Sequence, residues 1–133
     1  MTDRASGTFD VKLLPLAAHH TGDNAPVGRM SIDKVFHGDL AGTSEGEMLA
    51  AMTAVKNSAA YVALERLTGT LGGKKGSFVL QHTGIMNRGV GTLTVTVVPD
   101  SGTDELAGLT GTLEIIVEGK QHSYVFEYTM IEK

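Results

Sequence analysis

A histidine and a glutamine lie within one stretch of alternating apolar and polar residues, Ser77–Thr83. Successive side chains of a strand point to opposite faces, so His82 shares the apolar face with Phe78, and Gln81 lies on the other face. One of the two therefore faces an apolar interior or its opening. A neutral histidine there donates one hydrogen bond and accepts another, or acts as a base near neutral pH. The alternative is a structural histidine satisfied by a backbone carbonyl or a neighbouring side chain.

Glu65 and Arg66 raise the same question in an earlier stretch. Glu65 shares a face with Tyr61, and Arg66 shares the opposite face with Leu64, so one charged side chain of the pair points inward. Desolvation in an apolar interior raises the pKa of a carboxyl group, which is the condition for a general acid or a polar anchor. The alternative is an ion pair between Glu65 or Arg66 and a neighbouring strand.

Three other groups carry weaker signals. Glu45 and Glu47 lie two residues apart, so both project from one side of a strand, where we expect a solvated surface rather than acid–base or cation chemistry. His19 and His20 are adjacent and would point to opposite faces, so we expect a solvated loop and no metal site. Lys34 lies on an otherwise apolar face, and we expect its ammonium group to extend to solvent at the end of that element.

Several catalytic and binding motifs are missing from the sequence. It has no cysteine, which excludes disulfides, thiolate nucleophiles and zinc–thiolate sites. It also has no dinucleotide-binding Gly-x-Gly-x-x-Gly at a helix start, no phosphate-binding Gly-Lys-Ser/Thr loop, no His-Glu-x-x-His and no Gly-x-Ser-x-Gly. We therefore expect no metal and no cofactor, and the sequence supports neither nucleotide hydrolysis nor serine hydrolysis.

Composition limits the class of protein. The 133 residues, with a mass of 14.0 kDa, are enough for one hydrophobic core, and we expect a single domain over residues 1–133. Hydrophobic residues make up 41% of the chain, which argues against disorder, and no apolar run is long enough to cross a membrane as a helix. The net charge of −4 argues against a nucleic-acid partner or an anionic membrane. The first residues lack the apolar core of a secretion signal, so we expect a cytoplasmic protein.

Most of the chain has the alternation of strands. It is clearest at Gly91–Val98, where threonines occupy one face and Leu93, Val95 and Val97 the other. The same period recurs around residues 9–13, 30–36, 78–82, 113–117 and 124–128. Between these stretches lie segments typical of turns: 38–39, 72–76, 87–89, 99–102 and 118–120. The pattern predicts an all-β protein, an antiparallel sandwich or barrel.

One segment does not follow this pattern on composition alone. Glu47–Leu67 is rich in Ala, Leu, Met and Glu, and its residues are as compatible with a helix as with two strands divided at Lys56–Ser58. The sequence LTGTL at Leu67–Leu71 recurs at Leu109–Leu113, which places a glycine inside each of two stretches that read as strands. We expect these glycines to serve the corners of a closing barrel; the alternative is chance repetition in a chain rich in Gly, Thr and Leu.

Three motifs together resemble a known family: Tyr61–Gly73, Gly76–Gly84 and Glu105–Gly111. The likeness spans about Phe36 to Tyr128 and is to the bacterial family called domain of unknown function 3224. It implies one small antiparallel β-barrel of about eight strands with a central cavity, similar to the calycin-like barrel of plant allene oxide cyclases. It also implies that residues 47–67 form strand, turn and strand. Asp104 stands where the family usually has glycine, and the last strand is more apolar than is typical.

The family has no established activity, so the resemblance implies a barrel but not a reaction. From the residues, we expect the lumen to bind a small apolar or amphipathic molecule. The candidate lining residues are Tyr61, Glu65, Phe78, Gln81 and His82. One alternative is an isomerase or cyclase in which Glu65 or His82 moves a proton. Another is a homo-oligomeric structural protein that covers outward apolar positions such as Ile116 and Val125.

Overall fold

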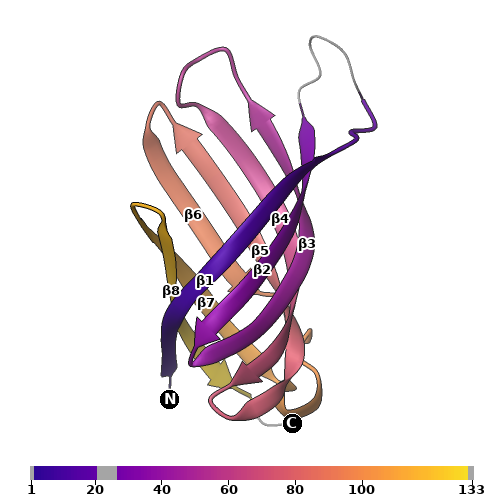
Figure 1. Ribbon diagram of the computed structural model, residues 1–133, viewed down its shortest axis with the longest axis vertical. Coiled ribbons are helices and arrows are strands. Elements are labelled where there is room, and N and C mark those ends of the chain that lie inside the picture. The colour runs from indigo at the N-terminus through magenta and orange to yellow at the C-terminus, as the bar shows by residue number, and fades with distance from the viewer. Residues whose placement is uncertain (1, 21–26, 132–133) are drawn as a thin grey trace.

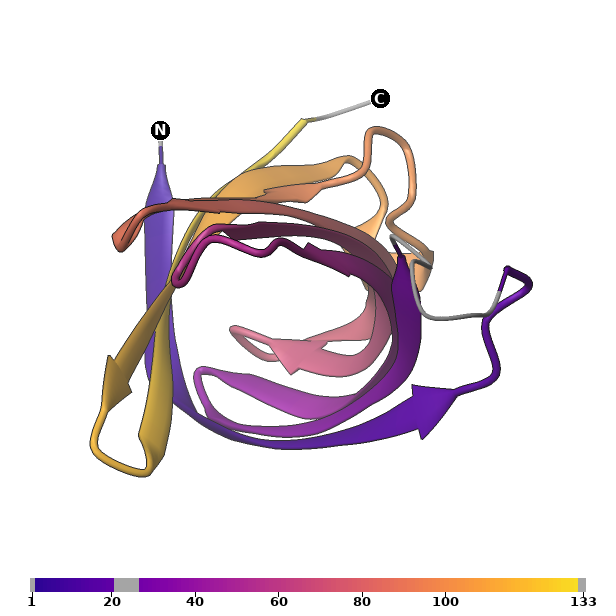
Figure 2. The ribbon, with the colours of Figure 1, turned by 90° about the horizontal axis from the view of Figure 1, so that it is seen from above.

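The computed structural model describes residues 2–20 and 27–131, which form a closed antiparallel β-barrel (Figures 1 and 2). Each strand pairs with the next along the chain, and the last pairs with the first. The strands are β1 (Asp3–Leu16), β2 (Gly28–Gly38), β3 (Leu40–Met52), β4 (Ala59–Leu71), β5 (Lys74–Asn87), β6 (Val90–Val97), β7 (Leu109–Glu118) and β8 (Gln121–Met130). The predicted all-β fold and barrel are confirmed.

The segment of ambiguous composition forms two strands. β3 ends at Met52 and β4 begins at Ala59, so the turn-like triplet Lys56–Ser58 lies in the hairpin loop between them. Tertiary pairing with β2 and β5 on either side outweighs the helix propensity of the alanines and leucines. Among the described residues, no helix has the length and apolar character needed to cross a membrane.

Buried apolar side chains fill one half of the barrel. This is the lower half in the view of Figure 1, the end at which both termini lie. The Phe78 and Phe126 rings stack with their centroids 5.8 Å apart. A short 3₁₀ turn, η1 (Asp104–Leu106), packs against β5 and contributes Leu106, which is completely buried. Large apolar side chains fill this end in the way that the interiors of small eight-stranded barrels are filled, so a ligand has no room here.

The upper half has a less complete wall. β6 and β7 pair only at Thr96 with Thr112. β8 pairs with β1 only as far as Phe9, whereas β1 continues to Leu16 against β2. Figure 2 shows the β7–β8 hairpin turned away from the rest of the ring. The upper wall therefore consists mainly of β1 to β6, and the lumen opens at this end.

The glycines of the repeated LTGTL motif make room for neighbouring strands. A Cβ atom at Gly69 would collide with the carbonyl oxygen of Ala41 on β3. A Cβ atom at Gly111 would lie 2.5 Å from the carbonyl oxygen of Glu127 and 3.0 Å from the Phe126 ring. Both positions therefore require glycine because the neighbouring backbone comes close.

Tyr124 connects β8 to the turn between β2 and β3. Its hydroxyl oxygen accepts the backbone N–H of Leu40 at 2.9 Å. Its hydrogen points to the carbonyl oxygens of His37 and Leu40, at 3.0 and 2.9 Å. The side chain is buried, so these bonds replace the water that the hydroxyl and the turn would otherwise bind.

Tyr124→Phe should lower the free energy of unfolding by about 1–3 kcal/mol, because it leaves the buried Leu40 N–H without its partner. Urea denaturation followed by circular dichroism measures this loss. Tyr128→Phe is the matched control, because it removes a hydroxyl from the same strand while leaving the Leu40 bond intact. Equal losses in the two variants would show that the hydrogen bonds of Tyr124 do not stabilise the turn.

Candidate functional site

A group of four polar side chains lies buried in the middle of the lumen. Glu65 accepts three short hydrogen bonds: from Lys34 Nζ at 3.0 Å, from Ser44 Oγ at 2.7 Å, and from His82 Nε2 at 2.7 Å. The Glu65 residue is 1% exposed and the His82 residue 3%. We call Lys34, Ser44, Glu65 and His82 the lumen cluster. Every buried side-chain nitrogen and oxygen of the described residues has a hydrogen-bond partner.

The register of four adjacent strands assembles the lumen cluster. Lys34 on β2 lies opposite Ser44 on β3. Glu65 on β4 lies opposite Gly46 on β3, and a Cβ atom at Gly46 would come within 2.6 Å of Glu65 Cα. The missing side chain at Gly46 leaves the space over β3 through which the carboxylate reaches Lys34. Gly46, two residues after Ser44, was a sequence signal that could have indicated a large inward side chain opposite it on the next strand.

Glu65 is ionised, which reverses the sequence-based prediction for its carboxyl group. Burial alone raises its pKa, but the His82 hydrogen bond, the charges of Lys34 and His82, and the Ser44 hydrogen bond outweigh this effect. Together they lower the pKa from its ordinary value of 4.5 to about 2. The ion pair, the alternative stated for Glu65 from the sequence, is present, and the expectation of a raised pKa is wrong. Alternation shows which face a residue occupies but not the partners that meet it across the barrel.

Lys34 does not extend to solvent, so that prediction is also wrong. Its side chain is 7% exposed. The ammonium group pairs with Glu65 and lies 4.9 Å from the centre of the Phe9 ring and 5.8 Å from that of Phe36. Two aromatic faces and a carboxylate together replace the water that a lysine needs.

His82 points into the lumen and Gln81 points outward. Gln81 is exposed on the outer face of β5, beside Leu64, so its assignment to the lumen lining was wrong. With Nε2–H donating to Glu65, a neutral His82 ring keeps Nδ1 as an acceptor. The hydrogen bond that His82 forms within the described residues uses Nε2. Nδ1 is therefore not among the fully buried atoms, all of which have partners. A carboxylate that accepts from one ring nitrogen fixes the orientation of the ring, and the second nitrogen can then accept a hydrogen bond from a ligand or take up a proton.

Above the lumen cluster, the open end of the barrel holds an apolar pocket of about 410 Å³. We call it the mouth pocket. Its lining comes from β3, β4, β5 and β6: Met48, Ala50, Met52, Ala59, Ala60, Tyr61, Gly84, Ile85, Met86, Gly91, Thr92 and Leu93. Of the predicted lining residues, only Tyr61 belongs to it. Met48 and Met86 point inward on the strands beside Glu65, as alternation along those strands would predict. No signal in the sequence shows which end of the barrel is empty, so neither methionine was among the predicted lining residues.

Tyr61 lies between the mouth pocket and the lumen cluster. Its ring crosses β5 at Gly84, where a Cβ atom would come within 2.5 Å of it, and its centroid is 6.4 Å from that of His82. Burial, and then the nearby Glu65 charge, raise the pKa of the Tyr61 hydroxyl, which is therefore a neutral phenol at physiological pH. Phe78 lies further down, in the packed lower half, and does not line the mouth pocket.

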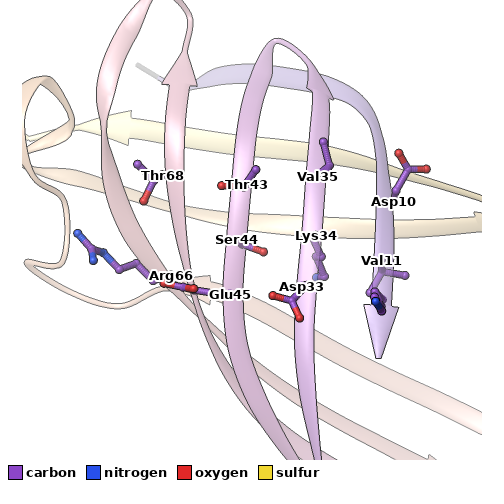
Figure 3. A pocket seen from close by; sticks show the side chains of 11 residues that line it. Asp10, Val11, Asp33, Lys34, Val35, Thr43, Ser44, Glu45, Arg66 and Thr68 are labelled. Atoms are coloured by element: carbon purple, nitrogen blue, oxygen red, sulfur yellow. The ribbon is translucent and has the colours of Figure 1, made fainter. Parts of the chain in front are cut away.

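A second hollow, of about 470 Å³, lies on the outside of β1 to β4 (Figure 3). Four charged residues of this hollow lie opposite one another on adjacent strands, in the order Lys12, Asp33, Glu45 and Arg66. The two acidic residues are therefore neighbours, with a basic residue on each side. Glu45 is exposed, in line with the expected solvated surface, and Glu47 pairs with Arg29 at 2.6 Å. Within the described residues, no group of three histidine, cysteine or carboxylate side chains could hold a metal ion.

His19 and His20, the adjacent histidines, lie outside any strand and are exposed, with their rings in edge contact at 4.6 Å.

Comparison with known proteins places this barrel in a family. The sequence profile described as "Protein of unknown function (DUF3224)" matches residues 5–128. The chain belongs to the DUF3224 family. The crystal structure of a DUF3224 protein of unknown function from Shewanella oneidensis MR-1, at 1.84 Å resolution, matches with a TM-score of 0.94 and 50% sequence identity over 100% of both chains. A search of curated proteins found no match.

These findings confirm the resemblance stated from the three motifs. The DUF3224 family carries no described reaction, so the function must be argued from the mouth pocket and the lumen cluster.

The lumen cluster should make stability depend on pH in the acid range. The pKa of Glu65 is lower in the folded than in the unfolded chain, so its contribution is complete above about pH 4.5 and is lost as the pH falls towards 2. The contribution is about 3 kcal/mol. Urea denaturation from neutral to acid pH should show a steeper loss for the wild type than for Glu65→Gln, with Ser44→Ala between them. Parallel curves for the wild type and Glu65→Gln would contradict an ionised, paired carboxylate.

Proposed function

We propose that this DUF3224 protein binds a small, mainly apolar molecule in the mouth pocket, with one polar group of the ligand directed towards Tyr61 and His82. The observation that carries the proposal is an open apolar pocket directly above a buried cluster whose charges are already balanced. Ligand sites commonly combine apolar walls of this size with a few convergent polar groups.

The walls of the mouth pocket favour apolar ligands of varied shape. Three methionines line it, Met48, Met52 and Met86, and methionine side chains adapt to different ligand outlines. Gly91 and Gly84 widen it on the β5–β6 side, although the Tyr61 ring occupies part of the space at Gly84. The volume of about 410 Å³ falls within the ordinary range for small-molecule sites.

The inner end of the pocket favours a neutral polar group on the ligand. The phenol of Tyr61 lines this end and is a donor. His82 lies behind that ring, so Nδ1 of a neutral His82 accepts only from a ligand group that displaces the ring. Lys34 and Glu65 already neutralise each other, so a charged group on the ligand would gain no compensating partner there. A hydroxyl or carbonyl group therefore suits this position better than a carboxylate or an amine.

A second candidate function is proton transfer on a bound apolar substrate, as in an isomerase or cyclase. The Glu65–His82 contact at 2.7 Å supports it, because the buried carboxylate holds the imidazole ring in a fixed orientation. His82 would be the base and Tyr61 the donor to a developing oxyanion. Glu65 cannot be the acid, because its pKa is lowered.

Filling the mouth pocket should abolish binding of an apolar probe. Ala50 faces the pocket, and Ala50→Phe should weaken the binding of N-phenyl-1-naphthylamine, measured by its fluorescence, by about tenfold or more. Ala51→Phe is the matched control: it makes the same change one residue along β3, on the outer face, and should leave the affinity within about twofold. Equal affinity in the wild type and Ala50→Phe would place the probe elsewhere and reject the proposal.

His82→Ala separates the two functions once native mass spectrometry of a lipophile panel has given a ligand. A binding protein should keep its affinity for that ligand within about tenfold, and the wild type should return it unchanged. An enzyme should convert the ligand in the wild type and bind without converting it in His82→Ala. Chemical analysis of the ligand after incubation distinguishes these outcomes.

A further inference from the structure

Charge is distributed unevenly along this chain. Residues 48–99 contain five basic residues and a single acidic one, Glu65, which is buried in the lumen cluster. The acidic excess of the protein therefore lies entirely outside this segment, which comprises β4, β5, β6 and the upper end of β3. The overall charge of −4 argues against an anionic partner for the molecule as a whole, but not for this part of its surface.

Two hairpin ends of this segment form one connected surface at the mouth. We call residues 52–59 and 86–90 the mouth platform. The backbone N–H of Gly89 donates to the carbonyl of Asn57 at 3.0 Å, and the N–H of Arg88 donates to Ser58 Oγ at 3.0 Å. The platform carries Lys56 and Arg88 and no acidic residue. Figure 1 shows both hairpin ends side by side at the upper end of the barrel.

The platform also exposes large apolar side chains. Met52 is 78% exposed and Val90 72%, and Val55 and Met86 are exposed as well. Single exposed apolar residues are ordinary, but four on two joined hairpin ends, beside two cations, form a surface suited to insertion into a lipid interface. Met52 and Met86 line the mouth pocket, so the platform surrounds its entrance.

The opposite end of the barrel offers a comparison within the same molecule. Lys74 and Lys75 follow the β4–β5 turn there, and the backbone N–H of Lys75 donates to the carboxylate of Glu105. Asp104 lies next to Glu105 in η1, so acidic groups accompany these lysines. Among the described residues, the mouth platform therefore combines two basic residues with exposed apolar side chains and no acidic residue, whereas the acidic turn η1 lies beside the two lysines at the other end.

We propose that the mouth platform docks on a lipid bilayer with anionic headgroups. Lys56 and Arg88 contact lipid phosphates, and Met52, Val55 and Val90 enter the interface. This inference rests on the proposed function and deepens it: the mouth pocket opens onto the membrane surface, so an apolar ligand passes between bilayer and lumen without crossing water.

Vesicle co-sedimentation at low salt tests the docking. The wild type should bind phosphatidylcholine vesicles that contain about one-third phosphatidylglycerol, and should bind pure phosphatidylcholine at least about tenfold more weakly. Lys56→Glu/Arg88→Glu should lose about tenfold or more in affinity for the anionic vesicles. The matched control Lys74→Glu/Lys75→Glu makes the same charge change at the other end and should stay within about twofold. Met52→Ser/Val90→Ser should lose several-fold and retain its thermal melting transition.

Three results would overturn the docking proposal. The first is that the wild type does not bind anionic vesicles. The second is an equal loss of vesicle affinity in the two charge-reversed double variants, which would show a general electrostatic attraction without a docking face. The third is a dimer in light scattering that Lys56→Glu/Arg88→Glu dissociates, with no vesicle binding, which would make the platform a contact between copies. Probe fluorescence without vesicles tests the mouth pocket separately, and Lys56→Glu/Arg88→Glu should bind the probe like the wild type.

Discussion

The upper part of this barrel depends on keeping one carboxylate charged in a place without water. Removing one partner of a buried charge typically costs about 3–5 kcal/mol, a large part of the net stability of a small domain, so the ionised Glu65 depends on the side chains that donate to it. Those partners come from β2, β3 and β5. A slip of one residue in any of these pairings would turn a partner to the outer face. The ion cluster therefore fixes the register of four neighbouring strands more strictly than apolar packing could.

This constraint also explains how the lumen is divided. Below Glu65, inward positions hold phenylalanines and leucines that pack to the density of a core. Above it, many of the residues that line the mouth pocket are alanines, glycines and flexible methionines, which leave part of the lumen unfilled. The packed half, together with the Tyr124 hydrogen bonds, stabilises the fold. The open half is then free to have a composition suited to a ligand rather than to stability.

Alternation and turn residues predicted strands in most of the chain but left residues 47–67 open between a helix and two strands. The family motifs implied the two strands there and the closure of the sheet into a barrel. Alternation also placed His82 and Gln81 on opposite faces of one strand, but it could not show which of the two faces lies inside the barrel. It failed for Lys34 and for the pKa of Glu65 for one physical reason. Both outcomes depend on a contact between β2 and β4, which are not neighbours in the sheet, and glycine at position 46 lets β4 come close to the intervening strand at Glu65.

The same contact limits the chemistry that this site can perform. A carboxylate that accepts from lysine, serine and histidine holds its proton too weakly to be a general acid near neutral pH. Any proton transfer must therefore use the outward nitrogen of His82, with Glu65 fixing the ring rather than reacting. Tyr61 lies between that nitrogen and the entrance, so a ligand must displace its ring or stop above it. Under the proposed function, a ligand that stops there is bound and released unchanged. In the second candidate function, a substrate displaces the ring and reaches His82, so the position of one phenol ring separates the two proposals.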